Sequence, residues 1–161
     1  ICCPLRGSRL YAENASIWEA GATVRFSRTN QFRISLSEHD QKQLSSMERI
    51  ERALADSTIL SYNIWDGDTL VGFAMPCPFE GNGFFLWNFA IDSAYQNRQY
   101  GQRALRDLLK MLKQEYQARV VTTTYTYGNN HAKYVYEKVG FRETDVVDEN
   151  GIHEVNMVAE L

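Results

Sequence analysis

A polar loop between an apolar strand and a long helix constrains the fold of this chain more than any other stretch. Residues 83–91 are aromatic and aliphatic, which predicts a strand, and residues 100–116 carry leucines at three- and four-residue spacing, which predicts a helix. The first amides of a helix lack partners within it and, together with the helix dipole, attract anions. Arg98 adds a positive charge to the loop, and Gly101 lets the backbone approach a ligand closely. We therefore expect this loop to bind a phosphate group, specifically a pyrophosphate.

The length and composition of the chain favour a single globular domain over residues 1–161. With 161 residues, 44% of them hydrophobic and 23% charged, the chain is long enough to bury a core and does not resemble a disordered protein. Its three cysteines, two of them adjacent, do not make a disulfide framework and favour a reducing, cytoplasmic compartment. No apolar run approaches the ~20 residues that a membrane span needs, and no signal segment leads the chain, so we expect no membrane association.

The net charge and the histidines narrow the classes of partner. A formal net charge of -3 argues against a nucleic-acid partner, which usually requires a basic face, and is compatible with a cationic substrate. The three histidines, His39, His131 and His153, have no metal-ligand spacing with cysteine or with one another. We therefore expect no metal site.

The remaining periodicities predict a mixed α/β chain in the order β-α-α-β-β-β-α-β-α-β-β. Strands are expected over 3–10, 59–65, 69–75, 83–91, 120–125, 141–147 and 153–159, and helices over 15–24, 37–55, 100–116 and 131–139. A capping box at residues 45–48 indicates a second helix start, residues 26–35 predict a loop or a short extended piece, and residues 76–82 predict a connection. On the long helix, the polar residues Arg106, Asp107, Lys110 and Lys113 are expected on the solvent face. Consecutive hairpin strands exclude a pure doubly wound fold, and the middle of the chain requires a parallel crossover.

Two motifs carry a resemblance to a known family. Residues 96–101 resemble the acyl-CoA loop of the GNAT family of N-acetyltransferases, Gln/Arg-x-x-Gly-x-Gly/Ala, with Gln99 in place of the first glycine. Residues 129–141 match the family's second signature, Asn-x-x-Ala-x-x-x-Tyr-Glu-Lys-x-Gly-Phe, at every fixed position. Within the family, residues 86–96 look most like bacterial spermine/spermidine (diamine) N-acetyltransferases, although Asn88 stands where a basic residue is expected.

The resemblance implies both a fold and a reaction. The fold would be the GNAT acyl-CoA N-acyltransferase fold, a mixed α/β (α+β) architecture whose central sheet of six to seven strands is flanked by about four helices. The reaction would transfer an acetyl group from acetyl-CoA to a primary amine, without a covalent enzyme intermediate. A polyamine or diamine such as spermidine or spermine is the implied acceptor. Aminoglycoside or protein amines remain alternatives, as does a non-catalytic module that binds acyl-CoA, and the pairing common in the family leaves a homodimer open.

The resemblance also assigns roles to individual residues. The strand backbone at Phe89, Ala90 and Ile91 would pair with the pantetheine arm, and Asn129 would contact the cofactor. The pyrophosphate would be held by the loop residues Gln96, Asn97, Arg98, Gln99, Tyr100, Gly101 and Gln102. Tyr136 would lie near the thioester sulfur and protonate the leaving thiolate; the alternative is a core aromatic on an amphipathic helix.

Amine chemistry sets independent requirements for such a site. An alkylamine has a pKa near ~10.4, so at neutral pH it must lose a proton before it can attack. A tyrosine stays protonated at pH 7 and can donate to a thiolate, and the amide of Phe89 or Ala90 could stabilise the oxyanion. The candidates for binding a cationic acceptor are Glu38, Asp40, Glu80 and Asp92. Glu80, in the connection before the central strand, is favoured among them, with Trp87 as a wall of the acceptor pocket.

Overall fold

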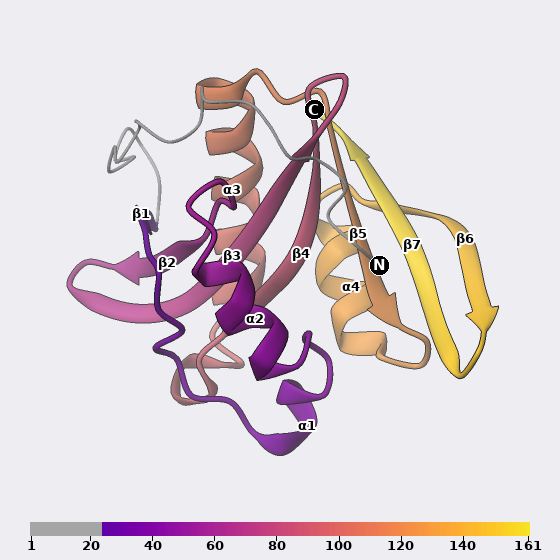
Figure 1. Cartoon of the computed structure of the whole chain (residues 1–161), viewed down its shortest axis with the longest axis horizontal. Helices are drawn as coiled ribbons and strands as arrows, with labels where there is room; N and C mark the ends of the chain where they lie inside the picture. Colours follow the sequence, from indigo (N-terminus) through magenta and orange to yellow (C-terminus); the bar gives the residue numbers. More distant parts are fainter. Residues whose placement is uncertain (1–23) are drawn as a thin grey trace.

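One mixed sheet organises the part of the chain that the structure describes, residues 24–161 of a computed structural model (Figure 1). Within those residues seven strands lie in the order β1-β2-β3-β4-β5-β7-β6. The elements in chain order are β1 (Arg25–Arg28), α1 (Glu38–Gln41), α2 (Met47–Leu54), β2 (Tyr62–Asp66), β3 (Thr69–Phe79), β4 (Gly83–Ile91), a 3-10 turn (Ser93–Tyr95), α3 (Tyr100–Tyr116), β5 (Val120–Thr126), α4 (Asn130–Lys138), β6 (Arg142–Glu149) and β7 (Ile152–Glu160). The predicted fold class, a mixed sheet with flanking helices, is confirmed.

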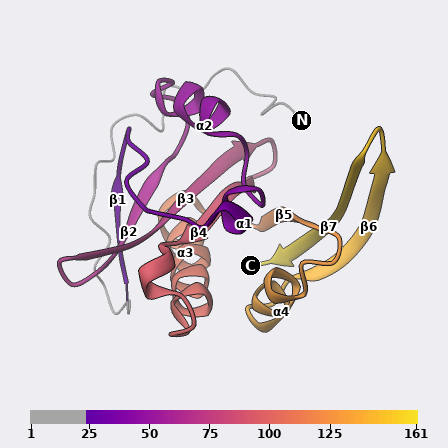
Figure 2. The same ribbon diagram turned by 90° about the horizontal axis from the view of Figure 1, so that it is seen from below.

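Helices cover both faces of the sheet. Figure 2 shows α3 and α4 on one face and α1 and α2 on the other. The leucine stripe of α3 packs on the sheet in a buried cluster that includes Leu105, Leu108 and Phe84. A second cluster, which includes Ile50 and Phe73, lies under α2. None of the helices in residues 24–161 combines the length and apolar character that a bilayer-crossing helix needs.

Strand β3 is longer than the sequence predicts, because it continues through Pro76 and Pro78 into the expected connection. It pairs with β2 only as far as Ala74, whereas its pairing with β4 continues to Phe79 after a register shift at Met75/Pro76. A proline has no N–H to donate, so strands tolerate it where one side has no neighbour. Among the described residues, the second half of β3 has no partner strand on the β2 side.

In the amino-terminal region, the short extended piece and the second helix start that the sequence indicates are both present. Within 26–35, residues 26–28 belong to β1, which pairs antiparallel with β2. The helical pattern over 37–55 forms two helices, α1 and α2, as the capping box indicates, but Ser46 rather than Ser45 caps α2, accepting from the Arg49 N–H at 3.3 Å. The strand predicted over 3–10 and the helix predicted over 15–24, apart from its last residue, lie outside the described residues.

One polar residue of α3 is buried, contrary to the prediction that it faces solvent. Asp107 is 4% exposed, and its carboxylate accepts a hydrogen bond from the Val24 N–H at 3.1 Å. A buried carboxylate requires such partners because its desolvation is costly. The two residues lie 83 positions apart, so helical periodicity alone could not reveal the contact.

Candidate active site

Strands β4 and β5 separate part-way along the sheet. They pair in parallel over only four positions, from Gly83 with Val120 to Leu86 with Thr123. The Thr123 hydroxyl donates to the Leu86 carbonyl oxygen at 3.1 Å at the last of these positions. Beyond it, within the described chain, β4 pairs only with β3 and β5 only with β7. The facing edges of the two strands are therefore open in the middle of the sheet, where an extended ligand can take the place of a strand.

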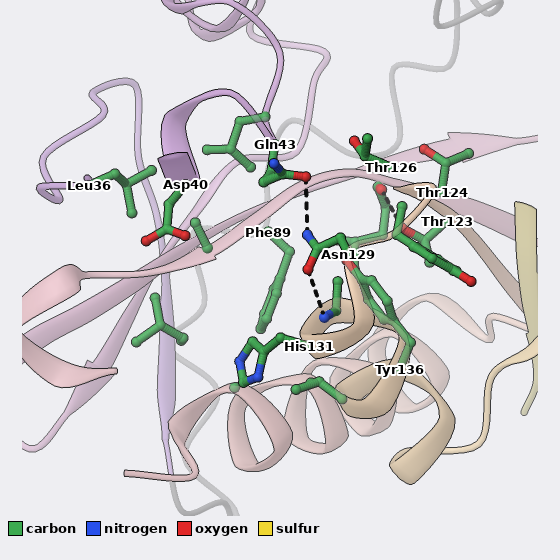
Figure 3. Close-up of a pocket in the computed structure, with 18 of the residues that line it drawn as sticks. Leu36, Asp40, Gln43, Phe89, Thr123, Thr124, Thr126, Asn129, His131 and Tyr136 are labelled. Carbon is green, nitrogen blue, oxygen red and sulfur yellow. Dashed lines mark hydrogen bonds between the residues drawn. The ribbon is translucent and has the colours of Figure 1, made fainter. Parts of the chain in front are cut away.

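A cavity of about 340 Å³ occupies this opening (Figure 3). Its walls come from both separated strands, from the α1 region, from the start of α3 and from α4. Polar side chains reach it from the α1 region, the loop before α3, β5 and the α4 region, among them Asp40, Gln96, Thr123, Asn129, His131 and Tyr136. A cavity of this size, with apolar walls and a few placed polar groups, is typical of a small-molecule site.

The loop after β4 leads into α3 through an unusual backbone path. Asp92 ends the strand by accepting from the N–H groups of Ala94 and Ser35, each at 2.9 Å. Asn97 and Gln99 then adopt left-handed conformations, with φ of 61° and 63°. Helix α3 begins at Tyr100 without a side-chain cap, so no side chain occupies its first amides.

Gln99 replaces the first glycine of the loop motif, yet its backbone adopts the left-handed conformation that favours glycine. Its φ of 63° and ψ of 11° lie in the left-handed region, which costs a residue with a side chain roughly 1–2 kcal/mol. Gly101, the motif's last position, lines the cavity. A Cβ there would meet only Val135, at 3.7 Å, an ordinary contact. The protein's own packing therefore does not require glycine at 101, which is consistent with space kept for a ligand.

Gln96 links the start of this loop to helix α1. Its side-chain amide donates both to the Ile91 carbonyl oxygen and to Asp40 Oδ2, each at 3.0 Å. Asp40 Oδ2 also accepts from the Ser37 hydroxyl at 2.9 Å. The two bonds of Gln96 hold the carboxylate of α1 and the end of β4 against the same loop.

Asn129 links α4 to the region between α1 and α2. Its side-chain oxygen caps α4 by accepting from the Ala132 N–H at 3.2 Å, and its Nδ2 donates to Gln43 Oε1 at 3.1 Å. Figure 3 shows this second bond between the two cavity-lining side chains. Asn129 therefore ties the start of α4 to the segment after α1 across the cavity wall.

Tyr136 brings a phenol to the point where β4 and β5 separate. Its ring packs edge-on against Phe141, with centroids 5.3 Å apart, and its side chain lines the cavity. Burial raises the pKa of Tyr136 above its usual 10, and the nearby Thr123 side chain partly offsets this rise. The phenol therefore keeps its proton throughout the neutral range.

Comparison with known proteins identifies the family to which these features belong. Residues 24–141 match the model of the Acetyltransferase (GNAT) family. The chain is a GNAT acetyltransferase. The resemblance predicted from the two motifs is confirmed, and so is the enzyme class, an acetyl-CoA-dependent acetyltransferase.

Individual GNAT relatives agree with this assignment. The spermine/spermidine N(1)-acetyltransferase of Bacillus subtilis (strain 168) is 33% identical over 133 residues, which are 75% of this chain and 86% of that protein. A GNAT family acetyltransferase from Elizabethkingia anophelis, solved with acetyl-CoA bound, has a TM-score of 0.66 at 18% identity and covers 86% of this chain and 99% of its own. The aminoglycoside acetyltransferase AAC(6')-Ib in complex with coenzyme A has a TM-score of 0.64 at 15% identity, covering 77% of this chain and 83% of its own. At these identities the two structures support the fold alone.

The structure brings most of the GNAT site residues predicted from sequence to the cavity. Those that line it are Phe89, Ala90, Ile91, Gln96, Gly101, Asn129, Tyr136 and Trp87. Arg98 and Tyr100 do not line it: Arg98 lies over the Tyr95 ring, and the Tyr100 hydroxyl donates to Asp66. Asn97, Gln99 and Gln102 do not line it either.

Acidic residues are placed differently from the expectation. Glu80 is exposed in the turn before β4 and does not line the cavity, and Asp92 is a capping residue. Asp40, weighed but not favoured from sequence, lines the cavity. The polar cavity-lining residues that sequence reasoning did not assign to the site include His39, Gln43, Thr123 and His131; His131 stands inside the second signature, at one of its variable positions. Within residues 24–161 no group of three or more potential metal ligands is brought together.

Proposed function

We propose that this GNAT enzyme acetylates a primary amine of a small diamine or polyamine by direct attack on acetyl-CoA. The observation that carries the proposal is the open pair of strand edges, which runs from the α3 loop to the phenol of Tyr136. The printed name of the relative that is 33% identical supports the choice of acceptor.

The chain's own groups fit the cofactor at both ends of the opening. The free amides at the start of α3 and the left-handed turn before it suit a pyrophosphate. The backbone of Phe89, Ala90 and Ile91, which lacks a strand partner on the β5 side, suits the amide groups of a pantetheine arm. When bound, acetyl-CoA supplies an activated acyl group and a thiol leaving group.

The cavity also carries groups suited to proton transfer. Tyr136 holds a proton at its phenol oxygen, beside Thr123, and donates it toward the thiolate that leaves. His39 and His131 line the same cavity, and an imidazole nitrogen can act as a general base. Either imidazole can accept the proton that the attacking ammonium must lose. The amide of Phe89 or Ala90 faces the opening as the oxyanion donor.

A screen of amine acceptors tests the proposal. Release of free CoA thiol from acetyl-CoA is measured with diamines, polyamines, aminoglycosides and peptides, together with acetyl-CoA binding by calorimetry. We expect rapid release with diamines and polyamines and little with peptides. Thiol release only with aminoglycosides would reassign the acceptor, and tight acetyl-CoA binding without release for any amine would contradict the proposed reaction.

A further inference from the structure

The cavity contains an isolated carboxylate. Asp40 is the only acidic side chain among the described residues that line the cavity, and no lysine or arginine among them lines it. Its other titratable lining groups are two histidines, His39 and His131, and two tyrosines, Tyr125 and Tyr136. The Tyr125 hydroxyl is already committed, because it donates to Glu143 at 2.6 Å. The negative charge of the cavity is therefore concentrated at one position.

Neutral groups orient this carboxylate without neutralising it. Both donors to Asp40 Oδ2, the Ser37 hydroxyl and the Gln96 amide, are uncharged. Within residues 24–161 Asp40 belongs to no ion pair, and its Oδ1 has no hydrogen-bond donor. Figure 3 shows the carboxylate directed from α1 into the open space beside Phe89. An oriented, partly buried carboxylate with a free oxygen is a strong acceptor for a cation.

The chemistry of the acceptor determines which cation suits this position. Both nitrogens of an alkyl diamine are protonated at neutral pH, but the nitrogen that attacks the thioester must be neutral. The reacting diamine therefore retains one ammonium, whereas a monoamine retains none. One carboxylate in the cavity matches one retained ammonium.

We infer that Asp40 binds the distal ammonium of the acceptor and thereby selects amines that carry a second cationic group. The inference rests on the proposed function, because it assigns the acceptor specificity of the same site. Gln96 connects this carboxylate to the loop at the start of α3, so Gln96 positions Asp40 from the cofactor side.

Kinetics with a matched pair of acceptors test the inference. The acceptors are 1,4-diaminobutane and 1-aminopentane, which differ by an amino group in place of a methyl group. Asp40→Asn should lower kcat/KM for the diamine roughly tenfold, mainly through KM, and should change kcat/KM for the monoamine less than about twofold. Ser37→Ala, which removes the hydroxyl that orients the Asp40 carboxylate and caps α1, should give a smaller loss confined to the diamine. Glu51→Gln, an equal charge change at an exposed position of α2, should change neither.

A binding measurement makes the inference independent of turnover. N-acetyl-1,4-diaminobutane retains only the distal ammonium, and N-pentylacetamide retains no charge. On CoA-loaded protein, Asp40→Asn should weaken binding of the first roughly tenfold and leave the second unchanged by calorimetry.

The outcomes separate this inference from the proposed function. If Asp40→Asn lowered kcat/KM equally for the diamine and the monoamine, and did so through kcat, Asp40 would be a base or a structural residue. That result would overturn the inference. Unchanged binding of N-acetyl-1,4-diaminobutane by a folded Asp40→Asn protein would overturn it as well. If the wild-type protein released no thiol with any amine, the proposed function would fail, and the binding measurement would still decide the role of Asp40.

Discussion

Tyr136 is the residue on which the proposed proton donation depends. A thiol has a pKa near ~8.5, below that of a tyrosine, so the phenol can stabilise a developing thiolate while it remains protonated in the resting enzyme. Burial at the separation of β4 and β5 raises the pKa of Tyr136 further, so ionisation of this group cannot limit activity in the neutral range.

Tyr136→Phe should lower kcat at least about tenfold, since positioned proton transfer is worth roughly 10² to 10⁴ in rate. Acetyl-CoA affinity, measured by calorimetry, should change little because the ring remains in place. Tyr134→Phe, at a position 52% exposed on the same helix, is the matched control and should leave kcat unchanged. An unaltered kcat in Tyr136→Phe would remove the phenol from the reaction.

Substitutions of Gly101 test whether the phosphates of CoA bind at the start of α3. Because a Cβ at this position meets only Val135, Gly101→Ala should keep or slightly raise the melting temperature, whereas Gly101→Glu should abolish CoA binding by bulk and like charge. Calorimetric titration with CoA checks the binding. Lys110→Gln, the same change in charge at an exposed position of α3, should bind CoA normally. Normal CoA binding by the glutamate variant would place the phosphates elsewhere.

Residues that act through distant contacts were the ones that sequence could not predict. The signature residues Asn129 and Tyr136 and the loop Gln96–Gly101 were predicted because fixed motif positions carry them. Asp40 lies 56 positions from Gln96, and nothing in the local pattern of α1 indicates that its carboxylate reaches the loop. Glu80 was favoured for its place before β4, but that place is the far end of the strand from the loop.

Helix α3 is bounded at both ends by glutamines in the left-handed conformation. Gln99 precedes it with φ of 63°, and Gln117 follows it with φ of 53°. The second is a common way for a helix to end, although glycine is the usual residue there. Gln99 also belongs to the loop proposed to bind the cofactor, whereas Gln117 does not. Substitutions at the two positions can therefore separate an effect on stability from an effect on cofactor binding.

Gln99→Gly and Gln117→Gly should each raise the free energy of unfolding by up to about 1 kcal/mol, because each relieves a left-handed side chain. Urea unfolding measures this gain. Only Gln99→Gly, which restores the motif's glycine, should also change CoA affinity, and we expect tighter binding. Loss of stability in Gln99→Gly would mean that its side chain contributes more than its backbone conformation costs.

Among the helices and strands, those with strong hydrophobic periodicity were predicted more accurately than those inferred from turn-forming residues such as proline. The leucine spacing of α3 and the apolar run of β4 predicted both elements at their observed bounds. Pro76 and Pro78 led to the prediction of a connection, because proline is rare inside strands that are paired on both sides. The sequence cannot show that β2 ends early and leaves one side of β3 unpaired. Likewise, the separation of β4 from β5 depends on pairing between distant strands and has no local signal.

The stability of the whole molecule should depend on pH through its tyrosines. The hydrogen bond to Asp66 raises the pKa of Tyr100, and burial is the main cause of the raised pKa values of Tyr62, Tyr125 and Tyr136. Burial and the hydrogen bond to Glu143 raise the pKa of Tyr125 from 10.0 to about 12. A raised pKa stabilises the fold fully below the unfolded value, and this contribution is lost as pH rises through the folded value.

The urea midpoint should therefore stay constant up to about pH 9 and fall as the pH rises above 10, the unfolded pKa of tyrosine. Tyr125, whose pKa is raised to about 12, contributes to this loss. Tyr125→Phe should make the alkaline decline shallower, whereas Tyr134→Phe, at an exposed position, should not. A midpoint that is flat to pH 12 would contradict the assignment.

The prolines of β3 also affect how this protein behaves at high concentration. An open strand edge can recruit a strand from another molecule, but Pro76 and Pro78 leave the free half of β3 without the N–H groups that recruitment needs. The edge strand β6 carries the carboxylates of Asp145, Asp148 and Glu149. Two molecules aligned there would bring like charges together. The free half of β3 and the edge at β6 therefore both resist the addition of a strand from another molecule.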